Sequence, residues 1–142
     1  LGVVQSGFNS FVVADIPGLI PGASEGIGLG IKFLKHLSRV KILLHLVDVS
    51  IFNNEQVIKN LKDINKELEL FSEELAQKEQ WILLNKNDVD PSKEKEIRDA
   101  IKVSFKDVKI FSISALSGLG LDKLLSKIGA SVISFNEIKA NE

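Results

Sequence analysis

The sequence contains no cysteine and no tyrosine, and only one tryptophan and three prolines in 142 residues. Without cysteine there is no disulfide framework, no thiolate nucleophile and no cysteine-ligated zinc site. This composition suits a reducing compartment, so we expect a cytoplasmic location. No apolar run approaches 18 residues, and the N-terminus has no basic region followed by an apolar stretch. We therefore expect neither a membrane-spanning helix nor a signal peptide.

Neither sign of charge is in excess. Lys and Arg total 18 and Asp and Glu total 19, which gives a net charge of −1. This balance excludes binding driven by a large positive field, on which nucleic-acid and anionic-membrane binding depend. Hydrophobic residues at 44% and charged residues at 26% match ordinary soluble usage, so the composition predicts a folded chain. Its length of 142 residues predicts one domain.

Four short apolar runs each end in a hydrogen-bonding side chain. They cover residues 11–14, 41–47, 81–84 and 108–113, and are followed by Asp15, Asp48, Asn85 and Ser114. Continuous apolar runs are typical of strands covered on both faces, as in a parallel sheet. In doubly wound folds ligands bind beyond the carboxyl ends of the strands. Four polar residues on one edge therefore predict a site for a polar ligand.

Helical periodicity separates the runs. Apolar residues spaced alternately four and three apart from Val57 to Leu75 predict one amphipathic helix of about five turns. Shorter patterns predict helices over 97–105, 121–132 and 31–37, and the Asp90-Pro91-Ser92 stretch marks the start of the first of these. Residues 1–5 predict a further strand, joined to the run at 11–14 by a hairpin turn. This alternation predicts a doubly wound α/β fold.

The stretch Asp15-Ile16-Pro17-Gly18 follows the first run. An acidic residue at the carboxyl end of a strand can hold Mg²⁺ through a hydration water. Gly18 can offer its backbone N–H to a phosphate because no Cβ is in the way. Taken alone, so short a motif is explained better by a plain turn with Pro-Gly punctuation.

The stretch Asn85-Lys86-Asn87-Asp88 follows the third run. A carboxylate there can accept two hydrogen bonds from the N1–H and N2–H₂ groups of guanine, which adenine does not offer, and the wrong base would leave it unpaired at a high cost. The aliphatic stem of Lys86 can lie along a flat base. A polar loop before a helix is the alternative.

The stretch Ser114-Ala115-Leu116 follows the last run, and a small residue with a free backbone N–H can approach a base carbonyl closely. This motif says little by itself, but the order and spacing of all three are informative. D-x-x-G, N-K-x-D and S-A-x each come after their own strand. Together they resemble the third, fourth and fifth signature motifs of the P-loop GTPases.

The stretch from Asp15 to Val47 narrows the resemblance. It is similar to the switch II region of the Obg family, which reads D-I-P-G-L-I, then a glycine-rich loop, then G-L-G-x-x-F-L-x-H. The matching residues are Gly26, Gly28, Leu29, Gly30, Phe33, Leu34 and His36. The resemblance covers roughly residues 1–135. It implies a Ras-like P-loop NTPase fold, a three-layer αβα sandwich with a mostly parallel sheet.

The resemblance also implies ligands and partners. The GTP-binding residues that it implies are Asp15, Ile16, Pro17, Gly18, Asn85, Lys86, Asn87, Asp88, Ser114, Ala115 and Leu116. Asp15 would hold Mg²⁺ through water and the Gly18 N–H would contact the γ-phosphate. Obg proteins are bacterial and organellar GTPases associated with the large ribosomal subunit, its assembly and stress responses. The implied partners are therefore GTP, GDP and that subunit, and the implied cofactor in a full-length parent is Mg²⁺.

One signature of P-loop GTPases is missing from the sequence. No G-x-x-x-x-G-K-[ST] motif occurs, because Phe8 follows Gly7 where a lysine is needed. The switch I threonine is also missing, and Pro21 stands where the family usually has an acidic residue. Leu19 cannot orient a water, so we assign no catalytic residue. We expect residues 1–142 to be a partial Obg-type G domain, truncated before Leu1, that lacks the P-loop strand, the P-loop and switch I.

Two functions fit these residues. The first is GTP hydrolysis in a full-length parent, with the 142-residue chain itself inactive. The alternative is a degenerate GTPase-fold interaction module without turnover. In the family fold the P-loop strand would separate the strand ending at Asp15 from the one ending at Asp48. Without it those edges could close on each other, pair with a second copy through edges or swapping, or be filled by an upstream segment. Of these we expect an intermolecular arrangement.

Overall fold

The computed structural model describes residues 2–6, 9–13, 39–51, 53–85 and 91–140. The elements are β1 (Gly2–Ser6), β2 (Asn9–Val13), β3 (Ile42–Asp48), α2 (Asn54–Phe71), α3 (Glu73–Ala76), β4 (Glu79–Asn85), α4 (Pro91–Ser104), β5 (Lys109–Ile113) and α5 (Leu121–Ala140). Strands and helices alternate from β3 onwards, which confirms the predicted α/β class. The helix expected over 31–37 lies outside the described residues.

The strands form two separate sheets. The order β3-β4-β5 makes a parallel sheet, whereas β1 and β2 form an antiparallel hairpin of their own. In the parallel sheet Asp48 is level with Asn85, and Asn85 is level with Ile113. The carboxyl ends of the three strands are therefore aligned along one edge.

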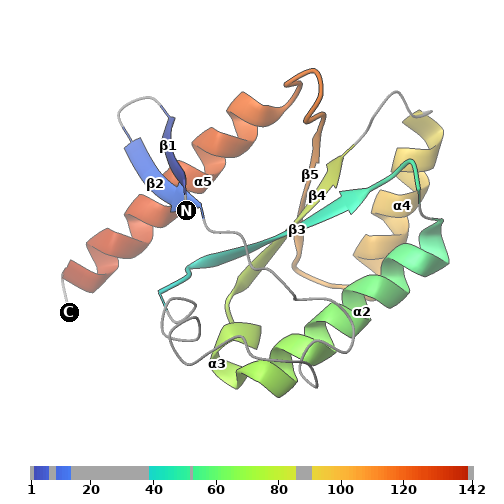
Figure 1. The fold of residues 1–142 in the computed structure, drawn as a ribbon, viewed down its shortest axis with the longest axis horizontal. Helices are drawn as coiled ribbons and strands as arrows, with labels where there is room; N and C mark the ends of the chain where they lie inside the picture. Colours follow the sequence, from blue (N-terminus) through green and yellow to red (C-terminus); the bar gives the residue numbers. More distant parts are fainter. Residues whose placement is uncertain (1, 7–8, 14–38, 52, 86–90, 141–142) are drawn as a thin grey trace.

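Side chains of β4 alternate between two cores, because successive residues of a strand point to opposite faces. Ile82 and Leu84 pack with α2 and α4. Trp81 and Leu83 pack with α5, and Phe11 of β2 joins this second core. Figure 1 shows α5 and the hairpin on one side of the parallel sheet, and α2, α3 and α4 on the other. This arrangement is the predicted three-layer order.

The helix expected from Val57 to Leu75 is two helices, so the predicted single element is wrong at its end. An Asn53 capping box begins α2, with Asn53 Oδ1 accepting from the Gln56 N–H at 2.9 Å. The chain turns extended at Ser72, whose hydroxyl then caps α3 by accepting from the Leu75 N–H at 3.2 Å. Leu68 and Leu75 still pack in one core, so the apolar spacing gives no sign of the break.

The helix α4 begins at Pro91, as the sequence predicts, and proline suits a first helical position because its missing N–H is not needed there. Ile97 and Ile101 point into the core and are fully buried.

Within the described stretches, no helix combines the length and apolar character needed to cross a membrane.

One edge of the parallel sheet carries an exposed apolar strip. β3 is the edge strand, and no other described strand pairs with its free side. Leu43 and Val47 are buried under the α2 layer, but Leu44 and Leu46 on the opposite face are 37% and 65% exposed. Because β2 pairs only with β1 among the described strands, the hairpin does not close onto β3.

His45 lies between these residues and is half-buried. Its Nε2 is 3.0 Å from Gln80 Oε1 on the neighbouring strand. Burial lowers the pKa of His45, an effect that outweighs the opposing hydrogen bond to Gln80. Burial and the bond to Gln80 are consistent with a packing role for this histidine.

The turn between β5 and α5 is closed by its own backbone. The Ser114 N–H donates to the Leu119 carbonyl at 2.9 Å, and the Gly118 N–H donates to the Ser114 carbonyl at 2.8 Å. Gly118 and Gly120 have φ of +81° and +80°, a region that residues with a Cβ rarely adopt. A Cβ on Gly120 would lie 2.5 Å from the Ser112 carbonyl oxygen, whereas one on Gly118 would meet no atom within 4 Å.

These two glycines give a matched test of the turn. Gly118→Ala should lower the free energy of unfolding by about 1–2 kcal/mol, the cost of the left-handed conformation alone. Gly120→Ala should lower it further, because the backbone of β5 must also move. Urea unfolding of both variants checks this, and equal losses would contradict the close approach at Gly120.

Candidate functional site

Three of the four polar residues predicted to share one edge lie within the described residues, and they do share it. Asp48 and Asn85 are partners across β3 and β4, and Ser114 follows Ile113, the β5 partner of Asn85. These residues therefore lie at the carboxyl ends of adjacent parallel strands, and Figure 1 shows the three strands β3, β4 and β5 side by side. Asp15, the fourth, lies outside the described residues.

A side chain of one motif binds the backbone of another. Asn85 Oδ1 accepts a hydrogen bond from the Ala115 N–H at 3.0 Å, across 30 positions of sequence. The backbone carbonyl of Asn85 also accepts from the Val49 N–H at 3.2 Å. Asn85 thus ties the ends of all three strands together. With Oδ1 engaged, its amide NH₂ is the group suited to a ligand, and it would donate to an acceptor such as a ring nitrogen.

This bond changes one detail of the expected site. The sequence suggests that a free N–H in Ser114-Ala115-Leu116 approaches a base carbonyl. The Ala115 N–H donates to Asn85, and the Ser114 N–H donates to Leu119. The N–H of Leu116 is the next along the loop. Ser114 is buried and its hydroxyl accepts from the Ser117 N–H at 3.2 Å, so its side chain organises the turn.

Asp48 has a local role at the end of β3. Its Oδ1 accepts from the Ser50 N–H at 2.9 Å and from the Ser50 hydroxyl at 2.5 Å. These bonds lower the pKa of Asp48, and the bond from the Ser50 hydroxyl has the larger effect. The Lys93 ammonium lowers the pKa further. Lys93 of α4 also donates to the Ser50 carbonyl at 3.4 Å. Asp48 therefore holds the turn after β3 as an ionised cap.

A polar network that none of the sequence motifs includes joins α4 to β5. Arg98 contacts Glu94 one turn earlier, with its Nη2 and Nε at 3.1 and 3.4 Å from Glu94 Oε1. Its Nη1 donates to the Ile110 carbonyl at 3.2 Å. The Ser112 hydroxyl donates to Glu94 and accepts from Arg98. The spacing of four between Glu94 and Arg98 is the one sequence signal for it.

The remaining predicted residues are outside the described part of the chain. They are Asp15, Ile16, Pro17, Gly18, Lys86, Asn87 and Asp88. Their roles stay predictions. Among the described residues there is no group of three or more His, Cys, Asp or Glu side chains placed to hold a metal ion.

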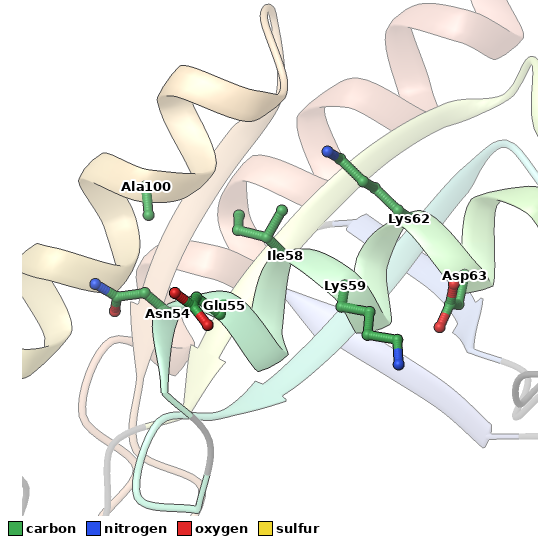
Figure 2. A pocket seen from close by; sticks show the side chains of 7 residues that line it. All are labelled: Asn54, Glu55, Ile58, Lys59, Lys62, Asp63 and Ala100. Carbon is green, nitrogen blue, oxygen red and sulfur yellow. The ribbon is translucent and has the colours of Figure 1, made fainter.

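A groove of about 460 Å³ runs between α2 and α4. Figure 2 shows Ile58 of α2 and Ala100 of α4 on its two sides, with Lys59 and Lys62 among the residues along it. Asp48, Asn85 and Ser114 do not line it. These three polar residues are therefore not part of the groove.

The sequence matches known proteins over most of its length. Residues 1–86 match the family model described as 50S ribosome-binding GTPase. The GTPase Obg of Elusimicrobium minutum is 48% identical over 128 residues, 90% of this chain and 28% of that protein. Those of Alkaliphilus oremlandii and Vesicomyosocius okutanii are 41% and 46% identical, over 99% and 89% of this chain and 33% and 38% of theirs.

The chain thus spans about a third of the length of these relatives, with 28–38% of each covered. The resemblance drawn from the motifs and the match to the family model agree with each other. The parallel strands, their aligned polar ends and the bond between Asn85 and Ala115 agree with both. The chain belongs to the family of 50S ribosome-binding GTPases and is a homologue of the Obg GTPases.

Proposed function

We propose that residues 1–142 are the guanine-recognising part of an Obg-type G domain, which in the whole protein binds and hydrolyses GTP with Mg²⁺. The observation that supports this most directly is the bond between Asn85 and Ala115. It joins the N-K-x-D and S-A-x motifs at the carboxyl ends of adjacent strands, where ligands bind in doubly wound folds.

Each motif has a role in reading the base. Asp88 accepts from N1–H and N2–H₂ of guanine, and Lys86 lays its stem along the ring. The Asn85 amide NH₂ donates to the base, while the N–H of Leu116 approaches its carbonyl. Together these contacts favour guanine over adenine, because adenine would leave the Asp88 carboxylate unpaired.

The phosphate end of the site depends on groups outside these motifs. Asp15 would hold Mg²⁺ through water, and the Gly18 N–H would meet the γ-phosphate. The P-loop strand, the P-loop and switch I would come from a preceding segment. The free edge of β3 and the exposed Leu44 and Leu46 beside it fit a strand inserted there. The whole protein would bind the large ribosomal subunit, a partner that the family description supports. It would do so in the cytoplasm.

Asp88→Asn tests the guanine contact. An amide can donate to the C2 carbonyl of xanthine but cannot accept both hydrogens from guanine, so preference should shift from GDP toward xanthosine diphosphate. The shift should be about tenfold or more, since a lost hydrogen bond to a charged group is worth about 1.5–3 kcal/mol. Titration followed by NMR measures both affinities, even in the millimolar range.

Asp99→Asn is the matched control, because Asp99 is an exposed carboxylate on α4 away from the polar edge. It should leave the preference unchanged. An Asp88→Asn chain that still prefers GDP would show that this loop does not read the base.

The 142-residue chain should not hydrolyse GTP. Phosphoryl transfer depends on charge stabilisation around the phosphates, and the sequence has no P-loop lysine and no P-loop Ser or Thr to ligate Mg²⁺. Phosphate release from the purified chain should equal the rate without protein. Turnover that follows the protein through purification and is lost in Asp15→Ala would contradict this.

The free edge of β3 should make the isolated chain self-associate. Leu46→Lys places a charge on this edge and should shift the chain toward monomer in sedimentation at micromolar concentration. Leu70→Lys is the control, because Leu70 on α2 is 64% exposed against 65% for Leu46. Pairing through β3 would be refuted if the unsubstituted 142-residue chain sediments as a monomer. It would also be refuted if both substitutions have an equal effect.

A further inference from the structure

We propose that Arg98 is a positioning residue for guanine recognition, which fixes the first turns of α4 to the end of β5. This inference rests on the proposed function. It concerns a side chain that would not touch the nucleotide. Its effect would be on the spacing between the chain that leaves β4 at Asn85 and the loop that leaves β5 at Ser114.

The guanidinium of Arg98 reaches three acceptors at once. It donates to Glu94 Oε1, to the Ser112 hydroxyl and, at 3.2 Å, to the Ile110 carbonyl. The Ser112 hydroxyl in turn donates to Glu94, which closes the network. The side chains of Arg98 and Glu94 are only 26% and 13% exposed. Water therefore screens this pair less than an ordinary surface ion pair.

The network adds direction to an otherwise apolar contact. Ile97 and Ile101 hold α4 against the sheet, but hydrophobic packing has no directional preference and tolerates small shifts along the helix axis. Hydrogen bonds to a planar fork specify both distance and angle. Arg98 and Glu94 therefore set where α4 begins relative to β5.

The network lies close to the proposed recognition residues in sequence. Ser112 is two residues before Ser114, and Glu94 is six residues after Asp88. Asn85, the last residue of β4, is held by its bond to the Ala115 N–H. Pro91, the first residue of α4, is held through the contacts of Glu94 and Arg98 with β5. Sites of this kind need their groups placed to within about 0.5 Å, so both anchors matter.

The test uses two nucleotides that share every phosphate. GDP and inosine diphosphate differ only in the 2-amino group, which Asp88 would read, so their affinity ratio isolates base recognition. The unsubstituted 142-residue chain should prefer GDP by about tenfold, because one hydrogen bond to a charged group is worth about that ratio. Arg98→Lys keeps the charge but loses the fork, and Ser112→Ala removes the hydroxyl. In each variant the ratio should fall below about threefold.

The ratio separates positioning from a general loss of stability, because both nucleotides bind the same folded fraction. Lys102→Gln changes an exposed residue one turn after Arg98 and is the control. It should keep the affinity ratio of the unsubstituted chain. A ratio unchanged in both Arg98→Lys and Ser112→Ala overturns the inference.

A second measurement distinguishes this inference from the proposed function. Hydrogen exchange of the Ala115 amide reports the bond to Asn85, and it should quicken in the two network variants but not in Lys102→Gln. If the unsubstituted 142-residue chain does not prefer GDP to inosine diphosphate, the proposed function is refuted. The Ala115 exchange would still decide whether Arg98 positions this edge, and unchanged exchange would refute that role.

Discussion

The hydrogen bond from the Ala115 N–H to Asn85 Oδ1 is the contact on which the polar edge depends. It can form only because β4 and β5 are parallel, adjacent and in a register that places Asn85 level with Ile113. Parallel neighbours bring their carboxyl ends to the same edge, so loops far apart in sequence meet there. Asp48 joins them through the matching register of β3 with β4.

The two faces of the sheet are covered unequally, and this follows from the order of elements. α2 and α4 enclose Ile82, Leu84 and Val47 on one face, whereas α5 and Phe11 cover Trp81 and Leu83 on the other. Neither α5 nor the hairpin buries the outer half of β3 on that second face. Leu46 is exposed as a result, and an apolar strip beside an unpaired strand edge favours pairing with a further strand.

Function in this chain is divided between residues that would touch a ligand and residues that hold them. Asn85 holds Ala115 through its oxygen, and in the proposed function its NH₂ would also contact the base. Ser114 and Asp48 act on their own turns, through Ser117 and Ser50. In the inference above, Arg98 and Glu94 would touch no ligand and would act by fixing α4 to β5. A polar edge built in this way transmits the register of the sheet to the loops.

The sequence by itself determined the α/β class, the places of the strands and the three motifs, because apolar runs and helical periodicity are local signals. It also determined that Asn85 and Ser114 would share an edge, since parallel strands leave no other arrangement. It could not show the helix break at Ser72, because a serine hydroxyl can cap a new helix without disturbing the apolar spacing. Only the tertiary structure decided that the Ala115 N–H binds Asn85 and that Arg98 spans from α4 to β5. Those contacts join residues distant in sequence, and their geometry depends on the register and packing of whole elements.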